Sequence, residues 1–295
     1  MATSQISLII QAFRPKTLSA AVLPVTLGSF ASYVLFAEMN PLVFVCAMLG
    51  ALFIQIGTNL ANDAADFVRG ADGDDRKGPQ RLSQSRAMSP KKVMWMATGF
   101  FAAAALVGLP LVQIGGGVLI AIGLVSILMG YAYTSGPFPL AYHGLGDLFV
   151  ILFFGLIAVS TTVYLHAGVW APEAYVLGLQ AGFMSATLIM INNIRDSAED
   201  VKVGKKTLAV RLGVKNSKWL LAVYMYLPYF FCTYWLIPHY SHAAVLPFFA
   251  LFVSMPLMGQ IFETDPSPKY NQFLAKASLH SFVFSLLLML GLSIA

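Results

Sequence analysis

Long apolar stretches alternate with short polar ones along almost the whole chain. Stretches of about 20 apolar residues, the length that crosses a bilayer as a helix, recur nine times. They lie at 17–37, 42–66, 92–113, 116–136, 143–165, 172–194, 217–238, 243–262 and 273–294. This pattern predicts an all-α, polytopic membrane protein of about nine transmembrane helices, with residues 1–295 forming a single membrane domain.

The composition agrees with this fold class. Of the 295 residues, 58% are hydrophobic and only 11% are charged, whereas soluble domains carry about 25% charged residues. The first apolar helix is expected to remain in the chain, because the basic residues of the N-terminal stretch follow its apolar patch and no small-residue cleavage site comes after it.

Lys and Arg residues are sorted between the two sets of connections. All 18 lie before the first predicted helix or in and around the connections that follow the second, sixth and eighth helices. The opposite connections carry Glu38, His166, Glu173, His239 and His242, but no Lys or Arg. Because basic residues collect on the cytoplasmic side of a membrane, we expect a cytoplasmic N-terminus and an external C-terminus. The positive charge is therefore assigned to topology and to anionic lipid or phosphate ligands, and not to nucleic acid.

Two polar stretches, 59–81 and 192–211, begin at the cytoplasmic ends of the second and sixth predicted helices. One shift along the sequence aligns four pairs of residues: Asn59 with Asn193, Asn62 with Asp196, Asp66 with Asp200, and Gly70 with Gly204. Because these matches share one topological position, they predict two pseudo-repeats that face each other across one cavity.

Each polar stretch holds a pair of metal-binding residue types four positions apart, Asn62 with Asp66 and Asp196 with Asp200. If the helices continue beyond the membrane, each pair lies on one helical face. Two facing pairs make an oxygen-rich site without a nearby His or Cys, which favours Mg²⁺ over zinc. Because Mg²⁺ completes its coordination with water and phosphate oxygens, the expected ligand is a diphosphate. The neighbouring Asp63 is included among the candidate metal ligands.

Basic residues interleaved with these acids are candidates for holding phosphate oxygens. They are Arg69, Arg76, Lys77, Arg81, Lys205, Lys206 and Arg211. Asn59 and Asn193 are added as substrate-binding candidates. For any single base the alternative is ordinary charge that follows the positive-inside rule. For the acids the alternative is a capping or surface role, which does not explain the repeated spacing.

Several segments carry a family resemblance. They are "NDAADFVRGAD" (62–72), "GPQRL" (78–82), "YTSGP" (133–137), "LGDLFVILFFG" (145–155) and "NNIRDSAEDVKVGKKTLAVRLG" (192–213). The chain resembles the UbiA superfamily of membrane prenyltransferases, and is most similar to the branch that acts on 1,4-dihydroxy-2-naphthoate in menaquinone synthesis. The resemblance implies Mg²⁺-dependent transfer of a polyprenyl group from a polyprenyl diphosphate to this aromatic acid, with loss of diphosphate and CO₂. The alternative acceptors within the superfamily are 4-hydroxybenzoate and homogentisate.

The resemblance also implies roles for particular residues. It assigns the Mg²⁺ diphosphate to the two acidic motifs, which makes Asp66 and Asp196 the main catalytic candidates. The wider superfamily often carries a further Asp after the first motif, where this chain has Gly70 followed by Asp72. The resemblance therefore implies no definite role for Asp72.

Four further residues are weaker candidates. Tyr133 and Asp147 lie near the cytoplasmic ends of the fourth and fifth predicted helices, and an acid within a membrane indicates function, although Asp147 could instead start its helix. Arg14 and Lys16 are candidates for binding the acceptor carboxylate, or they only set the topology. A secondary transporter is the competing class, because buried acids and repeats also occur there. Acids at the cytoplasmic helix ends, away from the midplane, favour the enzyme.

Overall fold

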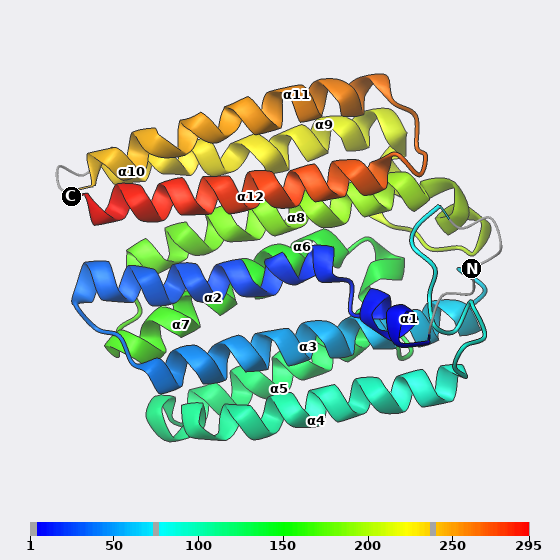
Figure 1. Ribbon diagram of the computed structural model, residues 1–295, viewed down its shortest axis with the longest axis horizontal. Helices are drawn as coiled ribbons and strands as arrows, with labels where there is room; N and C mark the ends of the chain where they lie inside the picture. The colour runs from blue at the N-terminus through cyan, green and yellow to red at the C-terminus, as the bar shows by residue number, and fades with distance from the viewer. Residues whose placement is uncertain (1–4, 73–76, 237–239, 295) are drawn as a thin grey trace.

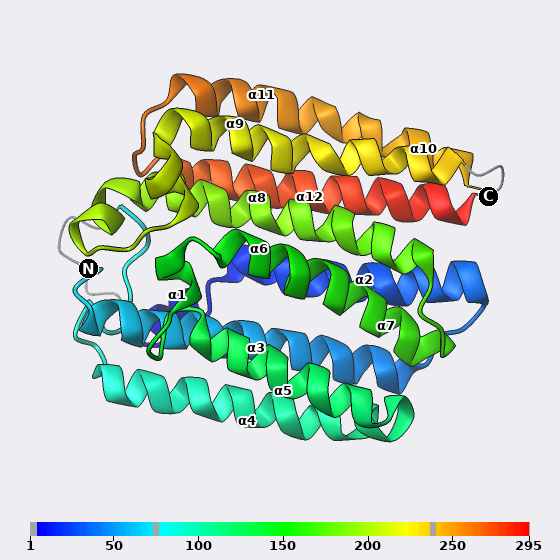
Figure 2. The same cartoon turned by 180° about the vertical axis from the view of Figure 1, so that it is seen from behind.

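The computed structural model describes residues 5–72, 77–236 and 240–294, which are mostly helical and include no strand. The long helices lie side by side along one direction, and their connections gather at two opposite ends (Figures 1 and 2). The predicted all-α fold is therefore confirmed.

The helices have the following bounds. The first half contains α1 (Gln5–Ala12), α2 (Pro15–Phe36), α3 (Pro41–Val68), α4 (Pro90–Gly115) and α5 (Gly117–Ala132). The second half contains the 3-10 helix η1 (Leu140–His143), α6 (Gly146–Ile151), the π-helical η2 (Leu152–Ile157), α7 (Ala158–Ala167), α8 (Pro172–Lys202), α9 (Leu208–Phe231), η3 (Cys232–Leu236), α10 (Ser241–Val245), η4 (Leu246–Ala250), α11 (Leu251–Glu263) and α12 (Tyr270–Ser293). Four long helices, α2, α3, α4 and α8, begin with a proline, whose fixed φ suits the first helical position.

Eight helical stretches in the described residues are long and apolar enough to cross a membrane. The remaining expected span, 116–136, is present as α5. This helix has only 16 residues, fewer than the roughly 20 that a full crossing needs. The predicted helix 116–136 ends at Ala132 instead. The chain then turns through Gly136, which has a φ of 80°, a conformation that glycine adopts without steric cost.

The predicted bounds of the sixth and seventh spans are wrong. Helix α8 continues past residue 194 to Lys202, and helical structure resumes at Leu208, although Gly213, with a φ of 74°, kinks α9 before the seventh predicted span begins. The predicted connection 195–216 is therefore reduced to residues 203–207. Hydropathy marks only the part of a helix that lies in lipid, whereas backbone hydrogen bonding continues through the charged residues beyond it. The second acidic motif consequently lies on a helix.

The two ends of the bundle differ in charge. The connections α3–α4, α8–α9 and α11–α12 lie at the end where α1 also lies, at the right of Figure 1. The described Lys and Arg residues lie in or near this end, as the alternation of spans predicted. Arg76 and His239, which entered that prediction, lie outside the described residues.

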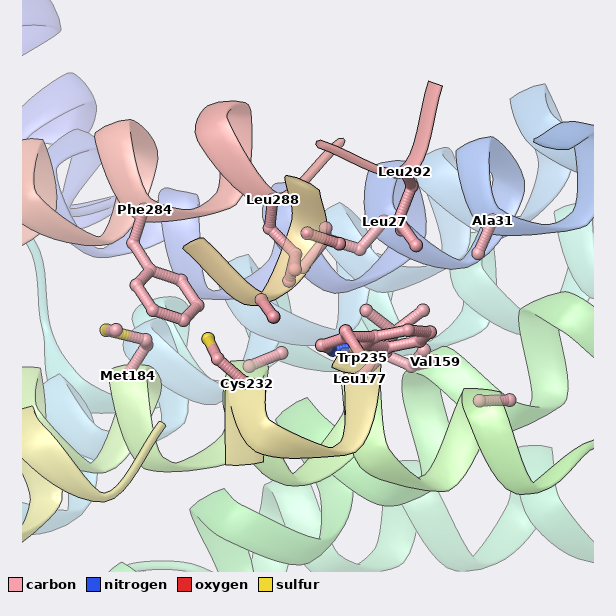
Figure 3. Close-up of a cluster of buried hydrophobic side chains, with 14 of the residues drawn as sticks. Leu27, Ala31, Val159, Leu177, Met184, Cys232, Trp235, Phe284, Leu288 and Leu292 are labelled. Atoms are coloured by element: carbon pink, nitrogen blue, oxygen red, sulfur yellow. The ribbon is translucent and has the colours of Figure 1, made fainter. Parts of the chain in front are cut away.

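The largest apolar cluster lies toward the opposite end and joins helices from both halves (Figure 3). Leu27 of α2, Val159 of α7, Leu177 of α8, Trp235 of η3 and Leu288 of α12 are all at most 2% exposed. Burial of these side chains holds α2 of the first half against α7, α8, η3 and α12 of the second half, so the acidic ends of the helices need not supply that stability.

Helix α8 also touches the end of α6 and the π-helical segment η2 through glycines. A Cβ added at Gly178 would lie 2.8 Å from the Cα of Leu156, and one added at Gly182 would lie 2.6 Å from the carbonyl oxygen of Ile151. Real side chains do not fit at these distances, so only glycine allows this backbone approach. The contact fixes the position of α8, which carries the second acidic motif.

Candidate active site between two helix ends

Helices α3 and α8 end in the same way, at equivalent residues of the two pseudo-repeats. The N–H of Ala71 donates to the carbonyl of Asp66, and the N–H of Lys205 donates to the carbonyl of Asp200. Between them, Gly70 and Gly204 have φ angles of 74° and 70°. Both ends are therefore Schellman motifs, in which a glycine in the left-handed conformation lets the chain turn back and satisfy the last carbonyls.

The two ends enclose a small polar pocket of about 20 Å³. Its lining includes acids from both motifs and bases from two connections. The lining residues are Asp66, Ala71, Asp72, Lys77, Arg81, Asp196, Glu199, Asp200 and Lys205. The fold thus brings together three of the predicted acids and three of the predicted bases from positions more than a hundred residues apart.

Asp66 lies at the centre of the contacts in this pocket and is 2% exposed. Nη1 of Arg81 donates to its Oδ2 at 3.0 Å, and the hydroxyl of Tyr142 donates to its Oδ1 at 3.0 Å. Nζ of Lys205 lies 3.6 Å from the same Oδ2 and 3.6 Å from Oδ1 of Asp200. Lys205 therefore lies between the acids of the two motifs.

Arg81 is buried and joins several groups of the first motif. Its Nη1 lies 2.8 Å from Oδ2 of Asp72 and donates to the carbonyl of Asn62 at 3.0 Å. Burial by itself lowers the pKa of Arg81, but the carboxylates of Asp72 and Asp66 outweigh burial and raise this pKa above its ordinary value. Arg81 thus remains a fixed positive charge in the pocket.

Asp196 is held by its neighbour in the sequence. Nε and Nη2 of Arg195 each donate to one Asp196 oxygen at 2.7 Å, a bidentate geometry typical of strong ion pairs. Nη1 of Arg195 donates to Oδ1 of Asn271 at 2.6 Å, and Nδ2 of Asn271 donates to the carbonyl of Lys77 at 3.1 Å. The start of α12 therefore connects the second motif to the α3–α4 connection.

Asp63 has different partners from the other candidate metal ligands. Its Oδ2 accepts the N–H of Leu82 at 2.9 Å, and its Oδ1 accepts the N–H of Ser83 at 3.0 Å. Asp63 does not line the polar pocket. Its two contacts anchor the connection that carries Arg81.

A larger cavity of about 310 Å³ extends among α2 to α8. Its lining residues Asn62 and Asn192 each lie about one helical turn before Asp66 and Asp196 of the polar pocket. Polar residues line one part of it, including Arg14, Asn59, Asn62, Tyr133 and Asn192. Apolar side chains line the part nearer the opposite end of the bundle, and these include Cys46, Leu111, Leu119 and Leu165. The cavity can hold an apolar chain whose polar head lies near the acidic helix ends.

Several predicted residues lie around the polar part of this cavity. Nδ2 of Asn59 donates to the carbonyl of Phe13 at 3.0 Å, and the side-chain oxygen of Asn62 accepts a hydrogen bond from Thr134. Tyr133 lines the cavity, and burial together with the carboxylate of Asp147 raises the pKa of Tyr133. Tyr133 is therefore a neutral hydroxyl at physiological pH.

Asp147 and Asn193 lie outside both cavity linings. Asp147 is 1% exposed, and its Oδ1 has no hydrogen-bond partner among the described residues. Asn192, and not its neighbour Asn193, lines the large cavity. A rotation of about 100° between successive helical residues separates such neighbours.

The remaining predicted bases hold the connection between α5 and α6. Arg69 donates to the carbonyl of Gly136 at 2.9 Å, and Arg211 donates to the carbonyl of His143 at 3.0 Å. Arg211 also donates to the carbonyl of Lys206 at 3.1 Å. Lys16 lies in the first turn of α2, and its side chain lies outside the described part of the structure.

The sequence interpretation missed Tyr142, Asn271, Glu199 and Asn192. Glu199 stands inside the second acidic stretch and forms an ion pair with Lys77 at 3.4 Å, so its charge was a usable signal. Tyr142 and Asn271 lie far from both motifs in the sequence. No local pattern could have connected either of them with the site.

The donor set of the polar pocket fits a magnesium diphosphate. In the described residues, no group of three or more His, Cys, Asp or Glu side chains could hold a metal ion without other ligands. Mg²⁺ is commonly held by one or two carboxylates together with substrate phosphates. The carboxylates here can supply the former, and the adjacent bases can hold the latter.

Comparison with known proteins gives consistent matches. A model of the UbiA prenyltransferase family matches residues 21–286. The 1,4-dihydroxy-2-naphthoate octaprenyltransferase of Haemophilus influenzae is 31% identical over 294 residues, which cover 95% of this chain and 94% of that protein. The protein of the same name from Mycobacterium tuberculosis is 38% identical over 210 residues, 70% of each chain.

The fold also matches solved structures. A UbiA homolog from Archaeoglobus fulgidus, bound to DMAPP and Mg²⁺, superposes with a TM-score of 0.64. The match covers 98% of this chain and 100% of that one, at 16% sequence identity. At this identity the likeness concerns the fold.

Proposed function

The chain belongs to the UbiA prenyltransferase family, and on this basis we propose that it transfers a polyprenyl group from a polyprenyl diphosphate to 1,4-dihydroxy-2-naphthoate. The naphthoate loses its carboxylate as CO₂, and the product is a precursor of menaquinone. The observation that carries the proposal is the position of the acidic pocket of α3 and α8 directly beside a large, mostly apolar cavity.

The diphosphate binds in the polar pocket in this proposal. Asp66, Asp196 and Asp200, with Asn62 nearby, hold Mg²⁺, which neutralises charge on the departing diphosphate when it is bound. Lys77, Arg81 and Lys205 line the same pocket and hold phosphate oxygens that the metal leaves exposed. Asp63 is left out of the proposed ligands, because its two oxygens already accept the N–H groups of Leu82 and Ser83.

The cavity supports the second half of the reaction. Loss of diphosphate leaves an allylic carbocation, which water would destroy. Walls formed by Phe149, Phe153, Leu188 and other apolar side chains exclude water and contact the prenyl chain. The carbocation is attacked by an electron-rich ring carbon of the naphthoate, and the carboxylate on this ring is then lost as CO₂.

The acceptor lies at the polar part of the cavity in this proposal. Arg14 lines that part and can pair with the acceptor carboxylate. Tyr133 is a neutral hydroxyl whose oxygen would lie 2.7 Å from a Cβ added at Gly146, the residue before Asp147. It can therefore donate a hydrogen bond to an acceptor oxygen. Asn59 and Asn192 complete the polar surface around the ring.

The protein is an integral membrane protein, as its long apolar helices and its family indicate. We propose that the whole chain forms one catalytic domain, with the polar pocket facing the cytoplasm and the C-terminus outside. The concentration of Lys and Arg at the pocket end of the bundle supports this orientation.

Product identification tests the proposed acceptor. Purified protein is incubated with Mg²⁺, a polyprenyl diphosphate and carboxyl-labelled 1,4-dihydroxy-2-naphthoate, with 4-hydroxybenzoate and homogentisate in parallel reactions. We expect a prenylated naphthalene product by mass spectrometry, and labelled CO₂ released in equal amount. A product formed only from 4-hydroxybenzoate, with its carboxylate retained, would leave the family membership intact and refute this acceptor.

Metal removal tests the proposed cofactor in the same assay. A chelator should abolish turnover, and added Mg²⁺ should restore it, because the bases of the pocket alone cannot neutralise a departing diphosphate. Turnover that persists in excess chelator would exclude the metal from the reaction.

A further inference from the structure

Tyr142 belongs to the short helix η1 in the connection between α5 and α6. Pro139 precedes this helix, and Gly144, with a φ of 73°, ends it. The N–H of Ala141 donates to the carbonyl of Tyr133 at 2.9 Å. Arg211 donates to the carbonyl of His143 at 3.0 Å. These contacts hold the short helix beside the polar pocket from two sides.

The Tyr142 side chain meets groups from both acidic motifs. Its hydroxyl donates to Oδ1 of Asp66 at 3.0 Å. The guanidinium carbon of Arg69 lies 4.7 Å from the centre of its ring, and Nζ of Lys205 lies 5.4 Å from it. The backbone of the same residue accepts the N–H of Lys206 at 3.1 Å. One aromatic residue from outside the motifs thus contacts Asp66 and Lys205 of the proposed diphosphate site, together with Arg69 next to it in space.

Each contact has a distinct chemical effect. A hydrogen bond to one carboxylate oxygen of Asp66 fixes the plane of the carboxylate and directs its other oxygen toward the pocket. Cations within about 6 Å of an aromatic ring are attracted to its face, so the ring restricts the long Lys205 side chain. The phenolic hydroxyl, which is ordinarily protonated at physiological pH, is the donor in the bond to Asp66.

We propose that Tyr142 is a positioning residue for the prenyl transfer: its hydroxyl orients Asp66 for the metal ion, and its ring holds Lys205 ready for the diphosphate. This inference rests on the proposed function. It extends the site to a third segment of the chain, the α5–α6 connection, because groups that hold metal-binding carboxylates tune the affinity of the metal.

Two substitutions separate the two roles. Tyr142→Phe removes the hydrogen bond to Asp66 and keeps the ring under Lys205. Tyr142→Leu removes both the hydroxyl and the aromatic face. Tyr131→Phe is the matched control, because it removes the same hydroxyl group at a different place. Tyr131 lies on α5, is 44% exposed and is outside both cavity linings.

The first measurement is the thermal unfolding temperature of the purified protein in the presence of inorganic pyrophosphate. Mg²⁺ is titrated, and the stabilisation is recorded at each Mg²⁺ concentration. We expect Tyr142→Phe to raise the Mg²⁺ concentration at half effect by roughly tenfold, the lower end of the effect of losing a partner of a ligating carboxylate. The second measurement is the KM for the polyprenyl diphosphate. It should rise in Tyr142→Leu by several times more than in Tyr142→Phe, because only the leucine variant releases Lys205.

The outcomes are distinguishable. A Tyr142→Phe protein with the wild-type Mg²⁺ midpoint would overturn the role of the hydroxyl. This holds even if the unfolding temperature of the variant without ligand is lower than that of the wild type. Equal KM values for the two variants would overturn the role of the ring. If the wild type itself shows no stabilisation by Mg²⁺ and pyrophosphate, the proposed diphosphate site fails together with this inference. Prenyl transfer that is intact in the wild type and unchanged in both variants would overturn only the inference.

Discussion

Asp66 receives contacts from three other segments of the chain. Arg81 reaches it from the α3–α4 connection, Tyr142 from η1 and Lys205 from the α8–α9 connection. Burying a carboxylate is costly unless it is paired. Asp66 is paired several times over, and this arrangement keeps a negative charge at a position where a metal ion can bind.

Asp66→Asn should therefore remove function and leave the fold intact. The amide keeps the shape of the side chain, and Arg81 retains Asp72 as a partner. We expect turnover to fall by more than about 100-fold, since loss of an indirect metal contact already costs about 10- to 100-fold. Turnover and thermal unfolding of the purified variant check this, and wild-type turnover would remove Asp66 from the proposed ligands.

Asp63→Ala should have the opposite signature. The N–H groups of Leu82 and Ser83 would lose their acceptor, at a cost of about 1–3 kcal/mol for each buried donor. The free energy of unfolding should fall, while the Mg²⁺ dependence of the remaining folded protein stays unchanged. A denaturant titration measures the first quantity and a Mg²⁺ titration of activity the second. A shifted Mg²⁺ requirement with unchanged stability would make Asp63 a metal ligand after all.

Arg14→Ala should affect one substrate more than the other. Arg14 lines the polar part of the large cavity, whereas it is absent from the lining of the polar pocket. We expect the acceptor KM to rise roughly tenfold, the effect of one lost charged hydrogen bond, with little change in the diphosphate KM. Steady-state kinetics with each substrate varied checks this, and equal changes would assign Arg14 to the general shape of the cavity.

The ends of α3 and α8 carry the functional residues at an electrostatic cost. Asp66 and Asp200 lie in the last turns of their helices, where the negative end of the helix dipole disfavours a carboxylate. A capping role, which acids have at the other end of a helix, cannot explain them. The nearby Arg81 and Lys205 offset this cost, so acids and bases at these ends form one unit.

The two glycines that end these helices should tolerate little change. Gly204→Ala creates no clash, because a Cβ there would have no atom within 4 Å. The left-handed conformation of an alanine nevertheless costs about 1–2 kcal/mol. We expect Gly204→Ala to lower stability by this amount and to displace Lys205. Gly204→Asn should be milder, since Asn enters this conformation more readily.

Gly99→Ala is the control for this prediction. Gly99 also has open space around its Cβ position, but it lies inside α4, where alanine is favoured over glycine by about 0.5–1 kcal/mol. Thermal unfolding should therefore show opposite signs for Gly99→Ala and Gly204→Ala. The same sign for both would contradict the conformational account of the helix end.

The whole molecule separates its charge from its apolar surface. The polar pocket and the basic connections lie at one end of the bundle, and the opposite end carries few charged groups. When the long helices span a membrane, the polar pocket therefore lies at one membrane surface. The large cavity reaches from this surface into the depth of the bilayer, where a polyprenyl chain is soluble.

Reporter fusions check the proposed orientation. Fusions after residues 80 and 205 should report the cytoplasm, and fusions after residues 40, 168 and 241 should report the external side, because Lys and Arg gather in the first set of connections. A reversed result at residue 205 would turn the pocket away from the cytoplasm and refute the proposed localisation.

The fold class, the sorted charge and the paired motifs were all predictable from the sequence. Each depends on a local period or on composition: about 20 apolar residues for a span, and four positions for one helical face. The same alignment also paired Gly70 with Gly204. The bounds of α8 and α9 did not follow, because hydropathy detects lipid contact and is blind to helix that continues in water.

The contacts within the site depended on the tertiary structure. Lys205 and Arg81 were two of seven equivalent bases in the sequence, and only the folded connections bring them to Asp66. Tyr142 has no signal of its own, because its partner lies 76 positions away. Which groups meet across such separations is determined by how whole helices pack, and a period read along one helix carries no information about it.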